Sequence, residues 1–168
     1  MPTPALRSAQ MLALAFMSMI VVLGVVVYLS VPDADLTLPS TYVIGGQVAA
    51  GVVIALIVST IGFRVAPITP GTAPEEAKGE ALQRHQMSLI LRLVLSELVA
   101  LVSLALAFIL TEGQVMTYVI GGAVSLALMA LFAYPSAGNI RRVEASLDSA
   151  GAQSRLAEAF AAPSGPSL

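Results

Sequence analysis

One acidic residue stands inside a long apolar stretch, and its carboxyl group is the strongest candidate for chemistry in this sequence. Glu97 lies about ten residues into the run from Met87 to Leu110. At ~1.5 Å per helical residue it is ~15 Å from the end of that run, near the centre of a bilayer. An acidic side chain there costs ~2.5–3.5 kcal/mol. Two interpretations are open: Glu97 binds a proton or another ion, or its protonated carboxyl donates a hydrogen bond to a neighbouring helix or subunit.

Two further polar residues precede Glu97 on the same stretch. A separation of five residues places Arg92 and Glu97 ~140° apart around a helix, so the two are poor partners, and Ser96 is a better neighbour for Arg92. We expect the long Arg92 side chain to extend to the membrane surface. His85 is expected to be a polar residue at that same surface.

The residue types that most enzymes and metal sites use are scarce. The chain has no cysteine and one histidine, and it contains no Walker loop, HExxH helix or Ser/His/Asp set. We therefore expect no enzyme activity, no metal site and no cofactor. The formal net charge of −2 gives no basic field for nucleic acid.

The composition indicates a lipid environment. Of 168 residues, 57% are hydrophobic and 11% are charged, whereas soluble domains carry about 25% charged residues. A membrane helix needs ~20 mostly apolar residues. Four stretches qualify: residues 8–32, 36–63, 87–110 and 113–140. The first is longer than the apolar region of a secretory signal peptide. The sequence thus predicts an all-α, polytopic membrane protein with four transmembrane helices.

Basic residues gather at one predicted end of these helices. With four crossings they fall at or near one face, while the short connections on the other face carry Asp33, Asp35 and Glu112. The positive-inside rule then predicts a multi-pass protein of the cell inner (plasma) membrane with cytoplasmic N- and C-termini. The residues expected at this membrane interface are Arg64, Arg84, Arg92, Arg141 and Arg142.

A hexapeptide occurs twice in the chain. Residues 41–46 read TYVIGG, residues 117–122 read the same, and at this offset of 76 positions residues 10–11 match residues 86–87. Two matches in register indicate tandem copies of a two-helix hairpin. Because both copies begin and end on one face of the membrane, they form a parallel repeat with its axis along the membrane normal.

Beginning at the glycines of the repeated hexapeptides, small residues recur four positions apart. Helices associate in lipid where small residues let two backbones approach closely. We therefore expect the second and fourth spans to pack against each other near the outer face. The alternative is that the glycines mark a segment where the helix is unwound and binds a ligand. The expected packing residues are Gly45, Gly46, Ala49, Ala50, Gly121, Gly122 and Ser125.

The chain therefore divides into two transmembrane hairpins, at residues 1–66 and 86–137. The cytoplasmic linker between them, residues 67–85, begins with three prolines, which favour extended chain. Within this linker the residues from Thr72 to Glu75 resemble a capping box. They predict that a short polar helix begins there and leads into the third span.

The last part of the chain differs from the hairpins. Ile140, Val143 and Leu147 follow helical spacing after Pro135, which predicts an amphipathic helix over residues 138–162. This helix either lies in the cytoplasmic interface or forms a solvated tail. Residues 163–168 are expected to be disordered.

Several short motifs resemble those of known proteins. They are Leu6-Arg-Ser-Ala-Gln10, Ser96-Glu-Leu, Thr111-Glu-Gly-Gln114 and Arg142-Val-Glu144. Over nearly the whole chain the sequence resembles a family of small uncharacterised bacterial four-helix membrane proteins, and this resemblance implies an architecture without a specific activity. The span around Glu97 also resembles the carboxyl-bearing helix of the proteolipid ring subunits of rotary ATPases. Proteolipids, however, place that carboxyl on the second helix of the hairpin.

These features favour a non-enzymatic structural or accessory subunit of a membrane assembly. Its expected partners are the lipid bilayer and either copies of itself or other membrane subunits. The alternative is a proteolipid-like subunit that translocates protons or ions through the Glu97 carboxyl.

Overall fold

The computed structural model describes residues 3–31 and 36–161. Within these ranges every regular element is helical. The positions of Asp33 and Asp35 and the predicted tail at 163–168 lie outside the described residues. The elements are α1 (Pro4–Ser30), α2 (Thr41–Thr60), α3 (Pro74–Ile109), α4 (Gln114–Leu128), the π-helical turn η2 (Met129–Ala133), α5 (Ala137–Leu147), the short 3-10 turn η3 (Asp148–Ala150) and α6 (Leu156–Ala161).

Four of the described helices are long and apolar enough to cross a membrane, as the sequence predicts. They are α1, α2, α3 and α4 together with η2. The predicted short polar helix before the third span is part of α3, which runs without interruption for 36 residues. The expected capping box does not form, because the Thr72 hydroxyl donates to the Thr69 carbonyl at 2.7 Å instead.

Local sequence explains the helix ends. Thr3 caps α1, since its hydroxyl accepts a hydrogen bond from the Leu6 amide at 3.3 Å, and Pro4 takes the first helical position, where no amide is needed. Gly113 turns the chain from α3 into α4 with a φ of 63°. A side chain there would also meet the backbone of Pro39, 2.6 Å from an added Cβ.

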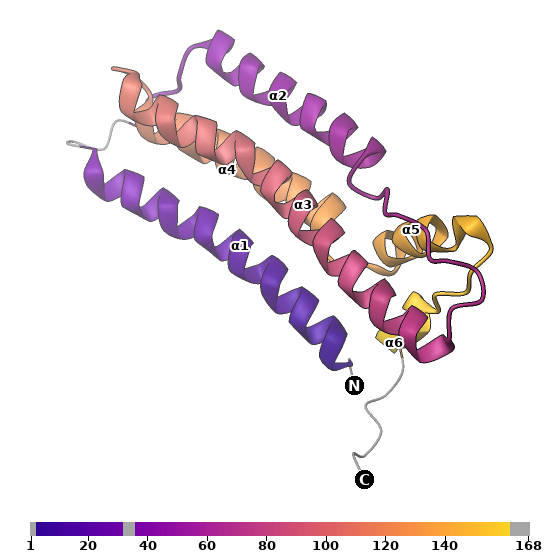
Figure 1. Ribbon diagram of the computed structural model, residues 1–168. Coiled ribbons are helices and arrows are strands. Elements are labelled where there is room, and N and C mark those ends of the chain that lie inside the picture. The colour runs from indigo at the N-terminus through magenta and orange to yellow at the C-terminus, as the bar shows by residue number, and fades with distance from the viewer. Residues whose placement is uncertain (1–2, 32–35, 162–168) are drawn as a thin grey trace.

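α3 and α4, the helices of the predicted second hairpin, form the central pair, and α1 and α2 lie on opposite sides of it (Figure 1). The helices of the predicted first hairpin therefore pack mainly on α3 and α4. The buried residues of α2 are Gln47, Gly51 and Val58, and an added Cβ on Gly51 would lie 2.5 Å from Val124 of α4. This narrow buried edge of α2 faces the central pair. The other sides of α2 are not buried against the described chain.

Small and polar residues let α4 approach α3. Ala100, Ser103 and Ala107 are all buried on α3, and the Ser125 hydroxyl of α4 accepts a hydrogen bond from the Ala100 amide at 2.8 Å. Side chains of this size allow close contact between two helix backbones. This tight seam fixes the centre of the molecule and the polar residues along it.

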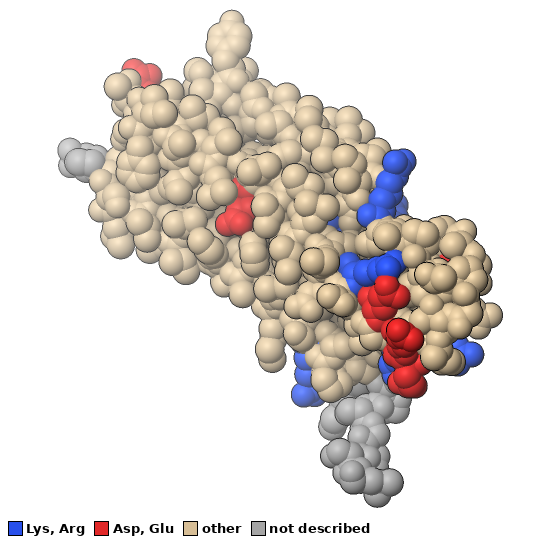
Figure 2. All heavy atoms as spheres, in the orientation of Figure 1, with Lys and Arg blue, Asp and Glu red and all other residues tan. Residues whose placement is uncertain are grey.

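The charged end of the molecule is built from α5, α6 and the segment that follows α2. The Ile68 amide donates to the Leu147 carbonyl at 2.9 Å, and the Ser146 hydroxyl bonds both backbone groups of Val65. Ile140, Val143 and Leu147 are buried in α5. Most charged side chains gather at this end, whereas the flank formed by the long helices is nearly free of charge (Figure 2).

Candidate functional site

Polar side chains are buried along the length of α3. Ser88, Ser96 and Ser103 accompany three ionisable groups, of which His85 is 2% exposed, Arg92 1% and Glu97 8%. Buried polar groups are costly unless hydrogen bonds satisfy them. Their partners therefore indicate which of these residues are structural and which remain free for chemistry.

Arg92 is a structural member of this row. Its Nε donates to the Ser88 carbonyl at 3.1 Å and its Nη1 to the Phe132 carbonyl at 2.9 Å, while its guanidinium lies 4.4 Å from the centre of the Phe63 ring. Arg92 is thus held by contacts within the protein, and its predicted place at the membrane interface stays a prediction. Arg92 and Glu97 form no ion pair, in agreement with their predicted separation around the helix.

The π-helical turn at the end of α4 gives Arg92 its acceptor. In η2 the Tyr134 amide bonds the Met129 carbonyl, five residues back, and the Phe132 carbonyl points to Arg92. A cation at the C-terminal end of a helix is stabilised by the carbonyls and the helix dipole there. Gly62 leaves space for the arginine, because an added Cβ would lie 2.7 Å from Arg92 Cγ.

Glu97 has no such partner. Its carboxyl makes no hydrogen bond or ion pair with any residue of the described ranges. It lies near enough to Tyr118 of α4 to act electrostatically on that phenol. The Tyr118 hydroxyl, however, donates to the Ile20 carbonyl of α1 at 2.7 Å. Glu97 is therefore the carboxyl that the helix packing leaves chemically uncommitted.

Gln47 joins α2 to the central pair. Its Nε2 donates to the Ser103 hydroxyl at 2.8 Å and to the Thr117 carbonyl at 2.7 Å, while its buried Oε1 has no hydrogen-bond partner. Sequence analysis did not assign this role to Gln47. Its polar side chain inside an apolar span was the available signal, since such side chains hydrogen-bond across helices.

The small residues expected to pack divide into two groups. Gly121, Gly122 and Ser125 of α4 are buried. An added Cβ on Gly121 would lie 1.8 Å from Ser103 Oγ, and one on Gly122 would lie 3.3 Å from Ile20. These α4 residues thus allow close approach to α3 and α1, and at Gly121 also to Gln47 of α2, 3.1 Å from the added Cβ.

On α2 the four expected packing residues do not form the contact with α4, although the two helices do pack against each other. Gly45, Gly46, Ala49 and Ala50 are all exposed, and added Cβ atoms on the two glycines would have no neighbour within 4 Å. α2 contacts α4 through Gln47 and Gly51 instead. The physical reason is rotation: the edge that carries Gln47 faces the central pair, which turns the small residues outward.

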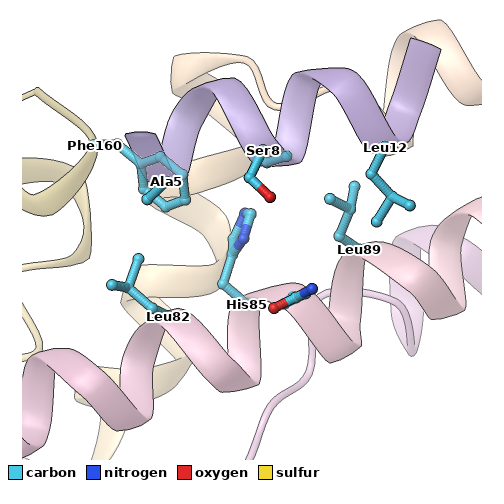
Figure 3. Close-up of a pocket in the computed structure, with 9 residues that line it drawn as sticks. Ala5, Ser8, Leu12, Leu82, His85, Leu89 and Phe160 are labelled. Carbon is cyan, nitrogen blue, oxygen red and sulfur yellow. The ribbon is translucent and has the colours of Figure 1, made fainter. Parts of the chain in front are cut away.

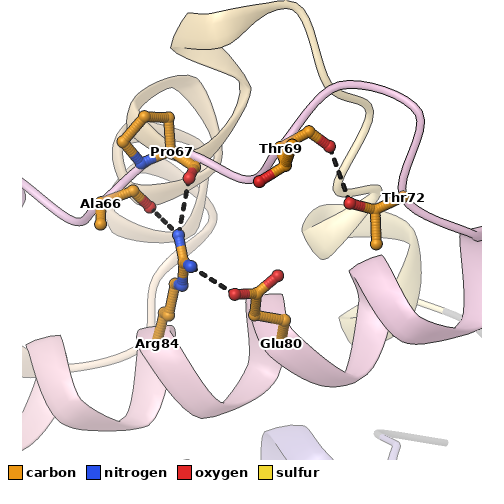
Figure 4. A network of polar contacts seen from close by, with 6 residues as sticks. All are labelled: Ala66, Pro67, Thr69, Thr72, Glu80 and Arg84. Carbon is orange, nitrogen blue, oxygen red and sulfur yellow. Dashed lines mark hydrogen bonds and ion pairs between the residues drawn. The ribbon is translucent and has the colours of Figure 1, made fainter.

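The remaining arginines lie at the charged end. Arg64, Arg141 and Arg142 are exposed, and the Arg142 guanidinium lies 5.3 Å from the Phe63 ring. Arg84 pairs with Glu80 and donates to the carbonyls of Ala66 and Pro67 (Figure 4). Arg84 therefore fastens the proline-rich segment to α3.

His85 faces a small cavity of about 90 Å³ between α1, α3 and α6. Its ring meets Phe160 edge-on at 4.9 Å, and its Nε2 is buried without a hydrogen-bond partner. In Figure 3 the imidazole points toward α1, beside Ser8 and Phe160. His85 is thus enclosed by three helices, whereas sequence analysis expected a residue at the membrane surface.

The described residues contain no group of three or more His, Cys, Asp or Glu side chains that could hold a metal ion. Comparison with protein families, curated proteins and solved structures finds no match for this chain. The function is therefore inferred from the structure of the chain itself.

Proposed function

We propose that this chain is a non-enzymatic structural or accessory subunit of a membrane assembly. The observation that carries the proposal is the unequal use of two identical hexapeptides. In α4 four of the six residues of the hexapeptide are buried and Tyr118 is 2% exposed, whereas in α2 Tyr42 is 93% exposed. Small residues that bring helices together in lipid are thus left uncovered on α2, where a second copy or another subunit is expected to bind.

The location and orientation of the subunit follow from its charges. We infer a bacterial inner membrane with both termini cytoplasmic, since basic side chains gather at one end of the long helices (Figure 2) and basic flanks stay inside. Helix α5 would then lie on the cytoplasmic side. Its apolar residues Val143 and Leu147 are buried within the protein, which supports a docked helix over one inserted in lipid.

The duplication is part of the same proposal. The residues that α1 buries are Ala9, Ala13, Ile20 and Val27. The residues 76 positions later are His85, Leu89, Ser96 and Ser103, and all four are buried in α3. Equivalent faces of the two helices are used, which supports descent from one hairpin. The architecture implied by the resemblance to small bacterial four-helix membrane proteins is consistent with this origin.

Stoichiometry tests the subunit proposal. The full chain, purified in a mild detergent, is expected to appear in native mass spectrometry as an oligomer or with a co-purifying membrane protein. Gly46→Leu should abolish that association by filling the exposed surface of α2. Gly79→Leu, on the exposed polar beginning of α3, is the matched control and should retain it. A wild-type chain that is monomeric and without partner in crosslinked membranes would refute the proposal.

The second candidate function is translocation of protons or other ions through Glu97. The specific observation in its favour is an acidic residue that is only 8% exposed and whose carboxyl makes no hydrogen bond or ion pair among the described residues. Ionisable groups within a membrane are functional candidates. Proton flux in proteoliposomes should then fall to the protein-free rate in Glu97→Gln and stay unchanged in Glu112→Gln, and equal flux in wild type and Glu97→Gln would exclude this role.

A further inference from the structure

A crevice opens between the segment that follows α2 and the first half of α3. Its volume is about 320 Å³, and its walls include Arg64 and Ala66 on one side and Arg84, Met87, Ser88 and Leu91 on the other. It lies at the charged end of the molecule, where the apolar flank begins. The two ends of the crevice therefore differ in chemistry.

The basic end carries a charge that no carboxylate neutralises. Arg64 is exposed, and its guanidinium has neither a hydrogen bond nor an ion pair in the described part of the chain. Arg84 is already occupied by Glu80 and two carbonyls, so it builds the wall and contributes little free charge (Figure 4). Arg64 is thus the side chain available for a ligand.

Neighbouring arginines add to the positive potential. Arg92 and Arg142 both lie against the ring of Phe63, the residue next to Arg64. Neither has a carboxylate partner among the described residues. Two guanidinium groups against the residue next to Arg64 add positive charge at this end of the molecule, and the planar guanidinium matches the geometry of phosphate oxygens.

The other end of the crevice is apolar and exposed. Met87 is 68% exposed and Leu91 42%, and the two residues follow each other by one helical turn in the direction of the apolar flank of α3. An anion bound at Arg64 could therefore carry a hydrocarbon chain along these side chains. A free inorganic anion would leave that wall uncovered.

We propose that this crevice binds an anionic phospholipid. Its phosphate contacts Arg64, and one acyl chain lies along Met87 and Leu91. Basic pockets between membrane helices bind anionic head groups in this way. The inference needs only that the long helices cross a membrane, and it does not depend on the proposed subunit function.

Lipid binding to the full chain in mild detergent tests the proposal. Native mass spectrometry would compare retained phosphatidylglycerol and phosphatidylcholine, both with palmitoyl and oleoyl chains. Wild type should retain the anionic lipid preferentially, and Arg64→Gln should weaken its retention about fivefold, the effect of one basic residue near an anionic lipid surface. Arg7→Gln removes an exposed arginine from α1, on the far side of the central pair, and should behave as wild type.

Two results would overturn the proposal. One is equal retention of the two lipids by wild type, a result that does not depend on how any variant folds. The other is equal retention of phosphatidylglycerol by Arg64→Gln and wild type. Competition separates a lipid from a free anion: inorganic phosphate should fail to displace phosphatidylglycerol at equal concentration, and efficient displacement would assign the crevice to phosphate and refute a lipid site.

Discussion

Gly121→Ala is expected to destabilise the protein through a single added methyl group. The new Cβ would lie 1.8 Å from Ser103 Oγ, 2.4 Å from Ser103 Cβ and 3.1 Å from Gln47 Nε2. Rotation of the hydroxyl relieves the first contact only, so α3 and α4 must separate. Overpacking of this kind costs ~1–3 kcal/mol. Alanine recovers up to ~1 kcal/mol of helix propensity, and we expect a net loss of ~1–2 kcal/mol.

The sequence repeat supplies the control. Gly45→Ala makes the same change 76 positions earlier, where an added Cβ has no neighbour within 4 Å. Only the propensity term applies there, so its stability should be unchanged or slightly higher. Both variants would be compared with wild type by thermal unfolding in detergent, followed by far-ultraviolet circular dichroism. A loss of ~1–2 kcal/mol corresponds to a midpoint lower by roughly 2–8 °C.

A double substitution examines the cause of the loss. Ser103→Gly removes both serine atoms that the methyl group would meet, so Gly121→Ala should cost much less in that background. This coupling identifies contact between the two side chains as the reason. Equal midpoints for Gly121→Ala and Gly45→Ala would refute the described packing of α4 on α3.

Further effects are expected at three positions. Tyr118→Phe removes the hydrogen bond to the Ile20 carbonyl and should cost ~1 kcal/mol, whereas Tyr42→Phe, on an exposed ring, should be neutral; equal midpoints in the same unfolding assay would contradict this difference. Asn139→Ala removes two hydrogen bonds that its Nδ2 donates to the carbonyls of Leu131 in η2 and of Tyr134 directly after it, at 3.1 and 2.9 Å. It should lower stability by ~1–3 kcal/mol, and a midpoint equal to that of wild type would show that the end of α4 does not need this cap.

The helices were predictable because their signal is local. Length and hydropathy identify the four spans, and Ile140, Val143 and Leu147 are buried on α5 as their spacing indicates. Two elements differ substantially in extent from their predictions. The polar beginning of α3 continues directly into its apolar part. The backbone hydrogen bonds of α3 form equally well between polar residues. The start of the apolar run therefore does not mark the start of the helix. The single helix predicted over residues 138–162 is divided into α5 and α6 within the described residues, because the chain turns at Gly151 with a φ of 90°.

The arrangement of the helices was not predictable from the same signals. Gly45 and Gly121 stand in identical hexapeptides, and only the contacts of their helices make one exposed and the other buried. Arg92 finds its acceptor 40 positions away, on the Phe132 carbonyl. No local pattern indicates that a π-helical turn would present that carbonyl. Glu97, by contrast, was identifiable from one sequence because its cost in lipid depends on residue type and depth alone.

Paired cysteines test most directly whether α3 and α4 separate α1 from α2 within the membrane. The chain has no native cysteine, so introduced pairs have no background. An added Cβ on Gly51 lies 4.0 Å from Val124 Cβ, within the range that a disulfide spans. After oxidation in carbonate-washed membranes, Gly51→Cys with Val124→Cys should crosslink, and Val22→Cys with Ala50→Cys, which a self-packed first hairpin would join, should not. Crosslinking of the second pair instead of the first, or release of the protein by the carbonate wash, would contradict the account.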